Sequence, residues 1–252
     1  MTDLLQPLLF FTTAALGGAI NAVAGGGSFL LFPVLMFGGL PPVAANVMCT
    51  IALWPASLAS SFTYWREVKT PFSVLKNLLV FCVAGSAIGA ATLLHFPEET
   101  FAALVPWLLL VATLIFTFGR TLLAKLRIAH TSTNHIAIYI GMLVIAIYGG
   151  YFGAGIGILM LAMLQLAGHS HMHEMNALKT VLGAAINGVA VVIFVASGHA
   201  VWQWAGILIA GGITGGYVGT KLALKLHPEK VRKMVVLIGF VMTTYFFLRL
   251  PW

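Results

Sequence analysis

Acidic residues are rare in this chain of 252 residues: Asp and Glu together number 6, and charged residues of both signs make up 8% of the sequence. A soluble globular domain usually has about 25% charged residues, so this chain has too few to cover a soluble surface. Hydrophobic residues make up 60%, and long apolar runs alternate with short polar loops. The sequence therefore predicts an all-α, polytopic transmembrane helix bundle.

Cysteine is scarcer still, and both cysteines, Cys49 and Cys82, lie in apolar runs. We expect them to be small packing residues and not a disulfide. Residues 1–7 contain Asp3 and no basic cluster, so no cleavable signal peptide is expected. The net charge of +7 comes without a basic face or a nucleic-acid motif. It predicts a membrane orientation and no nucleic-acid partner.

Two of the predicted helices are too short to cross a bilayer, which takes about 20 residues. These are 28–39 and 156–168, and each follows a glycine cluster, at 25–27 and 153–157. Since glycine permits backbone angles that other residues avoid, each half of the chain should open with a broken or re-entrant pair of segments. The ten predicted helices are 4–24, 28–39, 43–65, 72–95, 100–118, 136–152, 156–168, 174–197, 201–224 and 231–250.

The two halves, 1–119 and 135–252, resemble each other at an offset of about 130 residues, with a polar linker at 120–134. The recurrence of Asn-x-x-x-Thr and Gly-x-x-x-Gly in the same order predicts an internal duplication within one integrated transmembrane domain. The matched pairs are Gly25/Gly155, Gly27/Gly157, Asn46/Asn176, Thr50/Thr180, Gly85/Gly215 and Gly89/Gly219.

The basic residues favour five membrane segments in each half over four. With five, nearly every Lys and Arg lies on one face, and Arg249 lies on the other with Asp3, Glu98 and Glu99. With four, the basic residues divide almost evenly between the faces. The positive-inside rule prefers five, which predicts a cytoplasmic linker and non-cytoplasmic termini. An odd number of membrane segments in each half inverts the second repeat relative to the first. This arrangement recurs in secondary transporters.

No Asp or Glu lies within the core of a predicted membrane segment, since all six are at or near segment ends. This argues against an intramembrane carboxylate relay and against a site for a bare cation. A small anion fits better, because helix N-termini at the glycine breaks present N–H groups and positive dipole ends. The candidate substrate-binding residues are Asn21, Gly25, Gly26, Gly27, Asn46, Thr50, Gly155, Gly157, Asn176, Lys179 and Thr180.

An asparagine and a threonine four residues later share one helix face in each half. The amide and the hydroxyl can both donate hydrogen bonds to an oxyanion. They could instead join helices and hold the bundle together, and the aliphatic stem of Lys179 could carry its charge to water. Asn187, in the middle of its segment, is a secondary candidate.

Residues 169–174 contain three histidines and Glu174, all suitable zinc ligands. Their spacing matches no zinc motif, so no metal and no cofactor are predicted. A metal-dependent intramembrane enzyme at this run is one alternative to a transporter, and a passive anion channel is another. Pro55, after Trp54, should kink the third segment.

The stretch 17–28 (GGAINAVAGGGS), followed by Pro33 and Pro41, carries a family resemblance, as does 148–157 (YGGYFGAGIG) with 176–180 (NALKT) behind it. On these motifs the whole chain resembles the TauE/SafE sulfite exporter family of membrane permeases. The resemblance implies a permease of the cell inner (plasma) membrane for small sulfur-containing anions such as sulfite or organosulfonates, usually working in export.

The Gly-x-x-x-Gly pairs permit close helix contacts within one chain or between copies in a homo-oligomer. Because they recur in both halves, we expect them to pack helices within the chain. The sequence leaves the oligomeric state, the coupling ion and the exact anion open.

Overall fold

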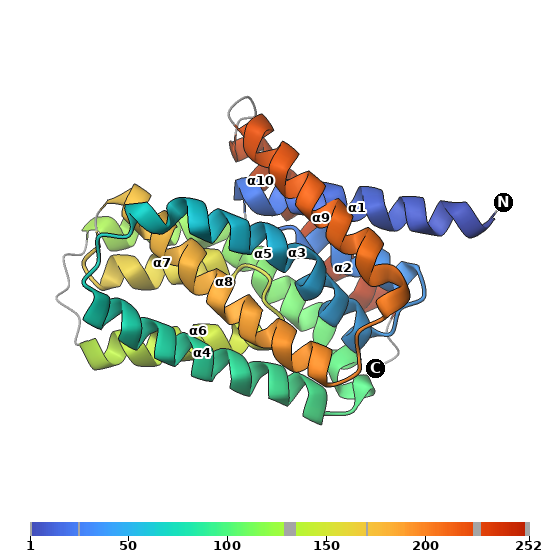
Figure 1. Cartoon of the computed structure of the whole chain (residues 1–252), viewed down its shortest axis with the longest axis horizontal. Helices are drawn as coiled ribbons and strands as arrows, with labels where there is room; N and C mark the ends of the chain where they lie inside the picture. The colour runs from blue at the N-terminus through green and yellow to red at the C-terminus, as the bar shows by residue number, and fades with distance from the viewer. Residues whose placement is uncertain (1, 25, 129–134, 170, 224–227, 250–252) are drawn as a thin grey trace.

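The computed structural model describes residues 2–24, 26–128, 135–169, 171–223 and 228–249. Within these ranges it contains ten α-helices, one short 3-10 helix, η1 (Trp65–Glu67), and no β-strand, which confirms the predicted all-α bundle (Figure 1). The α-helices are α1 (Thr2–Ala24), α2 (Ser28–Phe37), α3 (Pro42–Tyr64), α4 (Phe72–His95), α5 (Glu98–Ile128), α6 (His135–Tyr151), α7 (Ile156–Leu166), α8 (Met172–Ala196), α9 (Trp202–Ala223) and α10 (Pro228–Arg249).

The observed helix bounds agree with the predicted ones to within three residues, except for α5. That helix continues to Ile128 instead of ending at residue 118. Residues 120–128 contain three basic residues and a threonine, which interrupt the apolar run, but the rest are Leu, Ala and Ile, with neither glycine nor proline. These residues favour helix, so the loss of hydrophobicity ends the apolar run without ending the helix.

Five helices in the described part of the chain are long and apolar enough to span a membrane. α2, α6 and α7 are shorter apolar helices. The basic residues Arg66, Lys69 and Lys76 are exposed where α3 ends and α4 begins. We call this end of the bundle the basic face. The end at which α1, α3 and α5 begin is the terminal face, toward the right in Figure 1.

Both helix breaks pack against the same aromatic ring, that of Phe116 on α5. A Cβ on Gly26 would lie 2.9 Å from Phe116 Cζ, and one on Gly155 would lie 3.6 Å from Phe116 Cδ2. At the second break, Gly153 and Gly155 both have φ of +82°, a left-handed conformation that glycine adopts without strain. Glycine therefore both turns the chain between α6 and α7 and makes room for Phe116.

The two halves interlock, because α1 packs mainly on α9 and α4 packs mainly on α6. Since α1 corresponds to α6 and α9 corresponds to α4, each of these two pairings is the counterpart of the other in the opposite half. Gly85 and Gly89 of α4 lie against the backbone of α6, and Gly215 and Gly219 of α9 lie against α1. The expectation that the Gly-x-x-x-Gly pairs pack helices within the chain is confirmed.

We expect Gly89→Val to destabilise the protein by about 1–3 kcal/mol, the usual cost of overpacking. A Cβ at Gly89 would overlap the carbonyl oxygen of Ile147 and lie 2.8 Å from Tyr151 N. Thermal unfolding in detergent measures the effect. Gly206→Ala in α9 is the matched control, since a Cβ there meets nothing within 4 Å; equal melting temperatures for the two variants would contradict the prediction.

Candidate functional site

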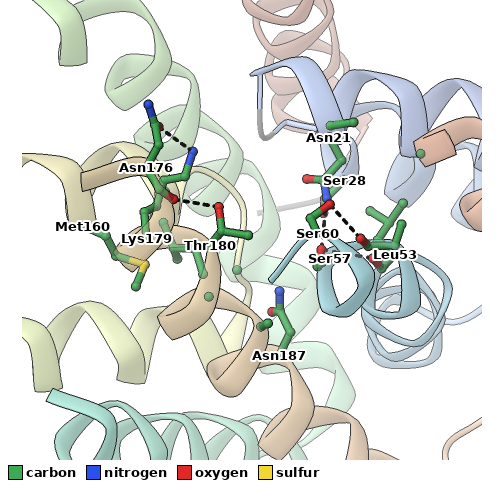
Figure 2. Close-up of a pocket in the computed structure, with 18 of the residues that line it drawn as sticks. Asn21, Ser28, Leu53, Ser57, Ser60, Met160, Asn176, Lys179, Thr180 and Asn187 are labelled. Atoms are coloured by element: carbon green, nitrogen blue, oxygen red, sulfur yellow. Dashed lines mark hydrogen bonds between the residues drawn. The ribbon is translucent and has the colours of Figure 1, made fainter. Parts of the chain in front are cut away.

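A cavity of about 510 Å³ lies between the two halves, beside both helix breaks. Tyr64, Glu67 and His173 line the cavity at the basic face. Phe152, just before α7, lines it deeper in the bundle. The cavity therefore connects the basic face with the middle of the protein, and its polar side chains come from α1, α2, α3 and α8 (Figure 2).

The second half contributes the cationic side chain of the cavity, Lys179. Its Nζ donates a hydrogen bond to Oδ1 of Asn176 over 3.3 Å, and it forms no ion pair with a carboxylate among the described residues. The stem of Lys179 lies over Gly157, where a Cβ would be 3.3 Å from Lys179 Cδ. A larger residue at the start of α7 would compete with the lysine for this space.

The first half contributes Asn21 and hydroxyl groups on the opposite side of the cavity (Figure 2). Asn21 Nδ2 donates to Ser57 Oγ over 3.4 Å. The hydroxyls of Ser57 and Ser60 donate to carbonyls one turn earlier, those of Leu53 and Ala56. The serine oxygens and the remaining polar atoms of the Asn21 amide are therefore available to a solute along the cavity wall.

Asn187 of α8 lies between these two groups of side chains, with its amide directed into the space that separates them (Figure 2). It makes no hydrogen bond with any of the described residues. An amide without a protein partner in a polar cavity is suited to bind water or a solute. Asn187 therefore belongs among the candidate binding residues, with Lys179 and Asn176.

Of the eleven predicted site residues, six line the cavity: Asn21, Thr50, Gly157, Asn176, Lys179 and Thr180. Gly26, Gly27 and Gly155 belong to the helix breaks and do not line it, and Gly25 lies outside the described residues. The second break therefore lines the cavity through Gly153 and Gly157, whereas the described glycines of the first break do not line it.

Asn46 does not line the cavity, although its counterpart Asn176 does. Its side chain is 3% exposed, and its Nδ2 donates to the carbonyl oxygen of Tyr151 over 3.0 Å. The alternative interpretation of the sequence, a contact between helices, therefore describes Asn46 in this structure. The two threonines do behave alike, since Thr50 and Thr180 each donate to the carbonyl oxygen of the asparagine four residues earlier.

Sequence reasoning missed Ser57, Ser60 and Cys49 of α3, which all line the cavity. The repeat contains the signal for two of them. At the offset of 130 residues Ser57 corresponds to Asn187, and Cys49 corresponds to Lys179. Applying the offset to every polar residue of α8 would have found both positions.

Aromatic rings fill the space between the cavity and the terminal face. Phe152 packs edge-to-face on Phe32, with ring centroids 5.7 Å apart. Phe32 in turn packs edge-to-face on Phe101, in the first turn of α5, at 6.5 Å. All three side chains are buried, so the cavity is closed at this end.

The alternative of a metal-dependent enzyme depends on residues 169–174. Within this run, Glu174 joins two loops of the basic face. Its Oε1 accepts a hydrogen bond from Thr70 Oγ1 over 2.8 Å and lies 3.6 Å from His169 Nδ1. His173 lines the cavity instead. Among the described residues there is no group of three His, Cys, Asp or Glu side chains placed to hold a metal ion, and Glu174 serves as a tie between loops.

Comparison with known proteins points to membrane transporters throughout. The family model "Sulfite exporter TauE/SafE" matches residues 10–246. The chain is 27% identical over 239 residues to "Probable membrane transporter protein" of Haemophilus influenzae, covering 93% of this chain and 92% of that protein. It is 26% identical to "Probable membrane transporter protein YfcA" of Escherichia coli K12, covering 96% and 90%. No solved structure matches it. Because the family model covers nearly the whole chain, this membrane transporter belongs to the TauE/SafE sulfite exporter family.

Proposed function

We propose that this protein exports small sulfur oxyanions, such as sulfite or an organosulfonate, by alternating access between two inverted repeats. The cavity between the halves is the binding site. Lys179, Asn176, Asn187 and Asn21 bind the anion, with hydroxyl groups of α3 on the opposite wall. The family supports the substrate class, and the donors of the cavity support an anion.

The observation that carries this proposal is the chemistry of Lys179. Its ammonium faces a polar cavity and has an amide oxygen as its hydrogen-bond partner instead of a carboxylate. A half-buried cation without a carboxylate partner among the described residues favours binding of an anion. The amide groups of Asn176, Asn187 and Asn21 supply neutral donors for the remaining oxygens.

The cavity opens at the face from which an exporter binds its substrate. The basic face carries Arg66, Lys69 and Lys76, so the positive-inside rule makes it the cytoplasmic face and leaves the termini outside the cytoplasm. The cavity reaches this face at Tyr64, Glu67 and His173. In this state an anion would enter from the cytosol of a cell whose inner membrane holds the protein.

Closure at the terminal face favours a transporter over a passive channel. A channel needs a continuous path through the membrane, whereas the buried rings of Phe32, Phe101 and Phe152 separate the cavity from the terminal face. Transport then requires a second conformation in which these rings separate. This is the structural basis for proposing alternating access.

Reconstitution into liposomes tests the function. Liposomes containing the protein and preloaded with unlabelled sulfite should accumulate labelled sulfite by exchange, whereas protein-free liposomes should not. An alternating-access transporter takes up label faster into preloaded liposomes than into empty ones, whereas a channel shows no such acceleration. Competition by thiosulfate, sulfoacetate and taurine would then rank the substrates. Absence of exchange with every one of these anions would contradict the proposed substrate class, and flux without exchange acceleration would favour a channel.

A further inference from the structure

Asn46 and Asn176 occupy equivalent positions in the two halves, yet they make different contacts. Asn46 Nδ2 donates to the carbonyl oxygen of Tyr151, at the end of α6. At the same offset of 130 residues, the equivalent of Tyr151 is Asn21, near the end of α1. The equivalent hydrogen bond would therefore join the Asn176 side chain to the Asn21 backbone.

That second hydrogen bond is not formed. Asn176 accepts from Lys179 through its Oδ1, and Figure 2 shows Asn176 and Asn21 on opposite sides of the cavity. The two threonines nearby make the same contacts within their own helices in both halves, so α3 and α8 are alike at this point and the asparagines differ in the contacts that they make with other groups. One member of a symmetric pair of contacts is closed and the other is open.

Helix packing shows the same difference independently. α3 packs on α5, and Val43 N donates to Glu98 Oε1 over 3.2 Å at the terminal face. The equivalent helices, α8 and α10, form no comparable contact in the described part of the chain. Among the described residues, the contacts of α3 with α5 that close the terminal face are therefore not repeated between α8 and α10; the side chain of Glu229, the counterpart of Glu98, lies outside those residues.

We propose that Asn46 and Asn176 are paired latch residues that determine which side of the membrane the cavity faces. The hydrogen bond from Asn46 to Tyr151 holds the terminal face shut in the state seen here. In the opposite state it breaks, and the Asn176 side chain donates to the carbonyl oxygen of Asn21 and shuts the basic face. This inference rests on the proposed transport by alternating access of inverted repeats, in which the halves exchange conformations.

The latch adds a second role to Asn176, which faces the anion while the basic face is open. Its Nδ2 is then available to the solute beside Lys179. Closing the basic face would bring Asn21, from the opposite wall, to the Asn176 amide. Binding and closure would thus use the same side chain in succession, whereas Asn46 has the equivalent position on the closed side.

Thiol labelling from each side of the membrane tests the latch. Ser60 lines the cavity, and its equivalent Ala190 is 1% exposed, so Ser60→Cys and Ala190→Cys form a symmetric pair of reporters. Each is placed separately in a Cys49→Ala, Cys82→Ala background. A membrane-impermeant methanethiosulfonate is applied to inside-out and right-side-out vesicles. The unlatched variants are Asn46→Ala and Asn176→Ala, with Asn77→Ala in α4 as a matched control.

Asn46→Ala should raise labelling of the Ala190→Cys reporter from the terminal face and lower labelling of the Ser60→Cys reporter from the basic face. One net hydrogen bond predicts a change of about twofold to tenfold. Asn176→Ala should leave the Ala190→Cys reporter protected, and Asn77→Ala should change neither. Asn46→Ser, whose shorter side chain falls short of Tyr151, should repeat the Asn46→Ala result if alanine impairs folding.

The proposal is overturned if Asn46→Ala and Asn176→Ala shift the two reporters in the same direction, or if neither shifts them. Labelling needs no substrate, so this outcome is independent of the liposome exchange assay. Lack of sulfite exchange together with the labelling shifts expected for Asn46→Ala would contradict the substrate and keep the latch. Sulfite exchange together with unchanged labelling would support the substrate and contradict the latch.

Discussion

Lys179→Gln should weaken transport more than any other single change in the cavity. It removes the ammonium that has no carboxylate partner among the described residues and keeps a donor of similar length. A hydrogen bond to a charged group contributes about 1.5–3 kcal/mol, so the apparent affinity for sulfite should fall by about tenfold to a hundredfold. The concentration dependence of exchange in liposomes measures this loss.

Lys76→Gln is the matched control, because Lys76 is exposed at the basic face, at the start of α4. It removes one positive charge from the protein without changing the cavity. A general electrostatic effect on anion entry would lower exchange in both variants and would weaken with salt. An equal loss in the two variants, or an unchanged affinity in Lys179→Gln, would remove Lys179 from the binding site.

Gly27→Ala and Gly157→Ala are expected to fail in different ways, although the two glycines are equivalent in the repeats. A Cβ on Gly27 would overlap the carbonyl oxygen of Gly17 and lie 3.0 Å from Asn21 Cβ. Since backbone cannot yield as a side chain does, we expect Gly27→Ala to cost about 1–3 kcal/mol of stability. For a protein of this size that lowers the melting temperature by about 2–4 °C per kcal/mol.

Gly157→Ala should leave the melting temperature nearly unchanged, because its Cβ meets the flexible stem of Lys179 at 3.3 Å. The lysine moves instead, so the apparent affinity for the anion should fall about threefold to tenfold, within the range expected for weakening one charged hydrogen bond. Thermal unfolding and exchange kinetics, measured on both variants, separate the two effects. A larger loss of stability in Gly157→Ala than in Gly27→Ala would contradict this assignment.

Hydropathy and glycine placement were sufficient to predict the helices. The short apolar runs after residues 27 and 155 became α2 and α7, because length against bilayer thickness and glycine before a helix are local properties. The one large error, the end of α5, arose where polar composition was taken as the end of a helix. Residues 120–128 are good helix formers, and helix formation does not require an apolar surface.

The cavity was predicted less completely than the fold. Lys179, Asn176 and Asn21 were named from their types and from their places beside the breaks, and they do line it. Ser57 and Ser60 were missed, because a serine in a helix most often hydrogen-bonds within its own helix, as both also do here. Their position opposite Lys179 depends on how α3 packs against the second half.

The sequence by itself determined the membrane class and the two broken helices, and it predicts the repeat and the side of the basic residues, because each follows from composition or spacing along the chain. The tertiary structure decided which of two equivalent asparagines faces the solute and which one joins two helices. Asn46 and Asn176 belong to the same motif, and a repeat treats them alike. A cavity open at one face and closed at the other is necessarily asymmetric, and that asymmetry exists only in the folded arrangement of the two halves.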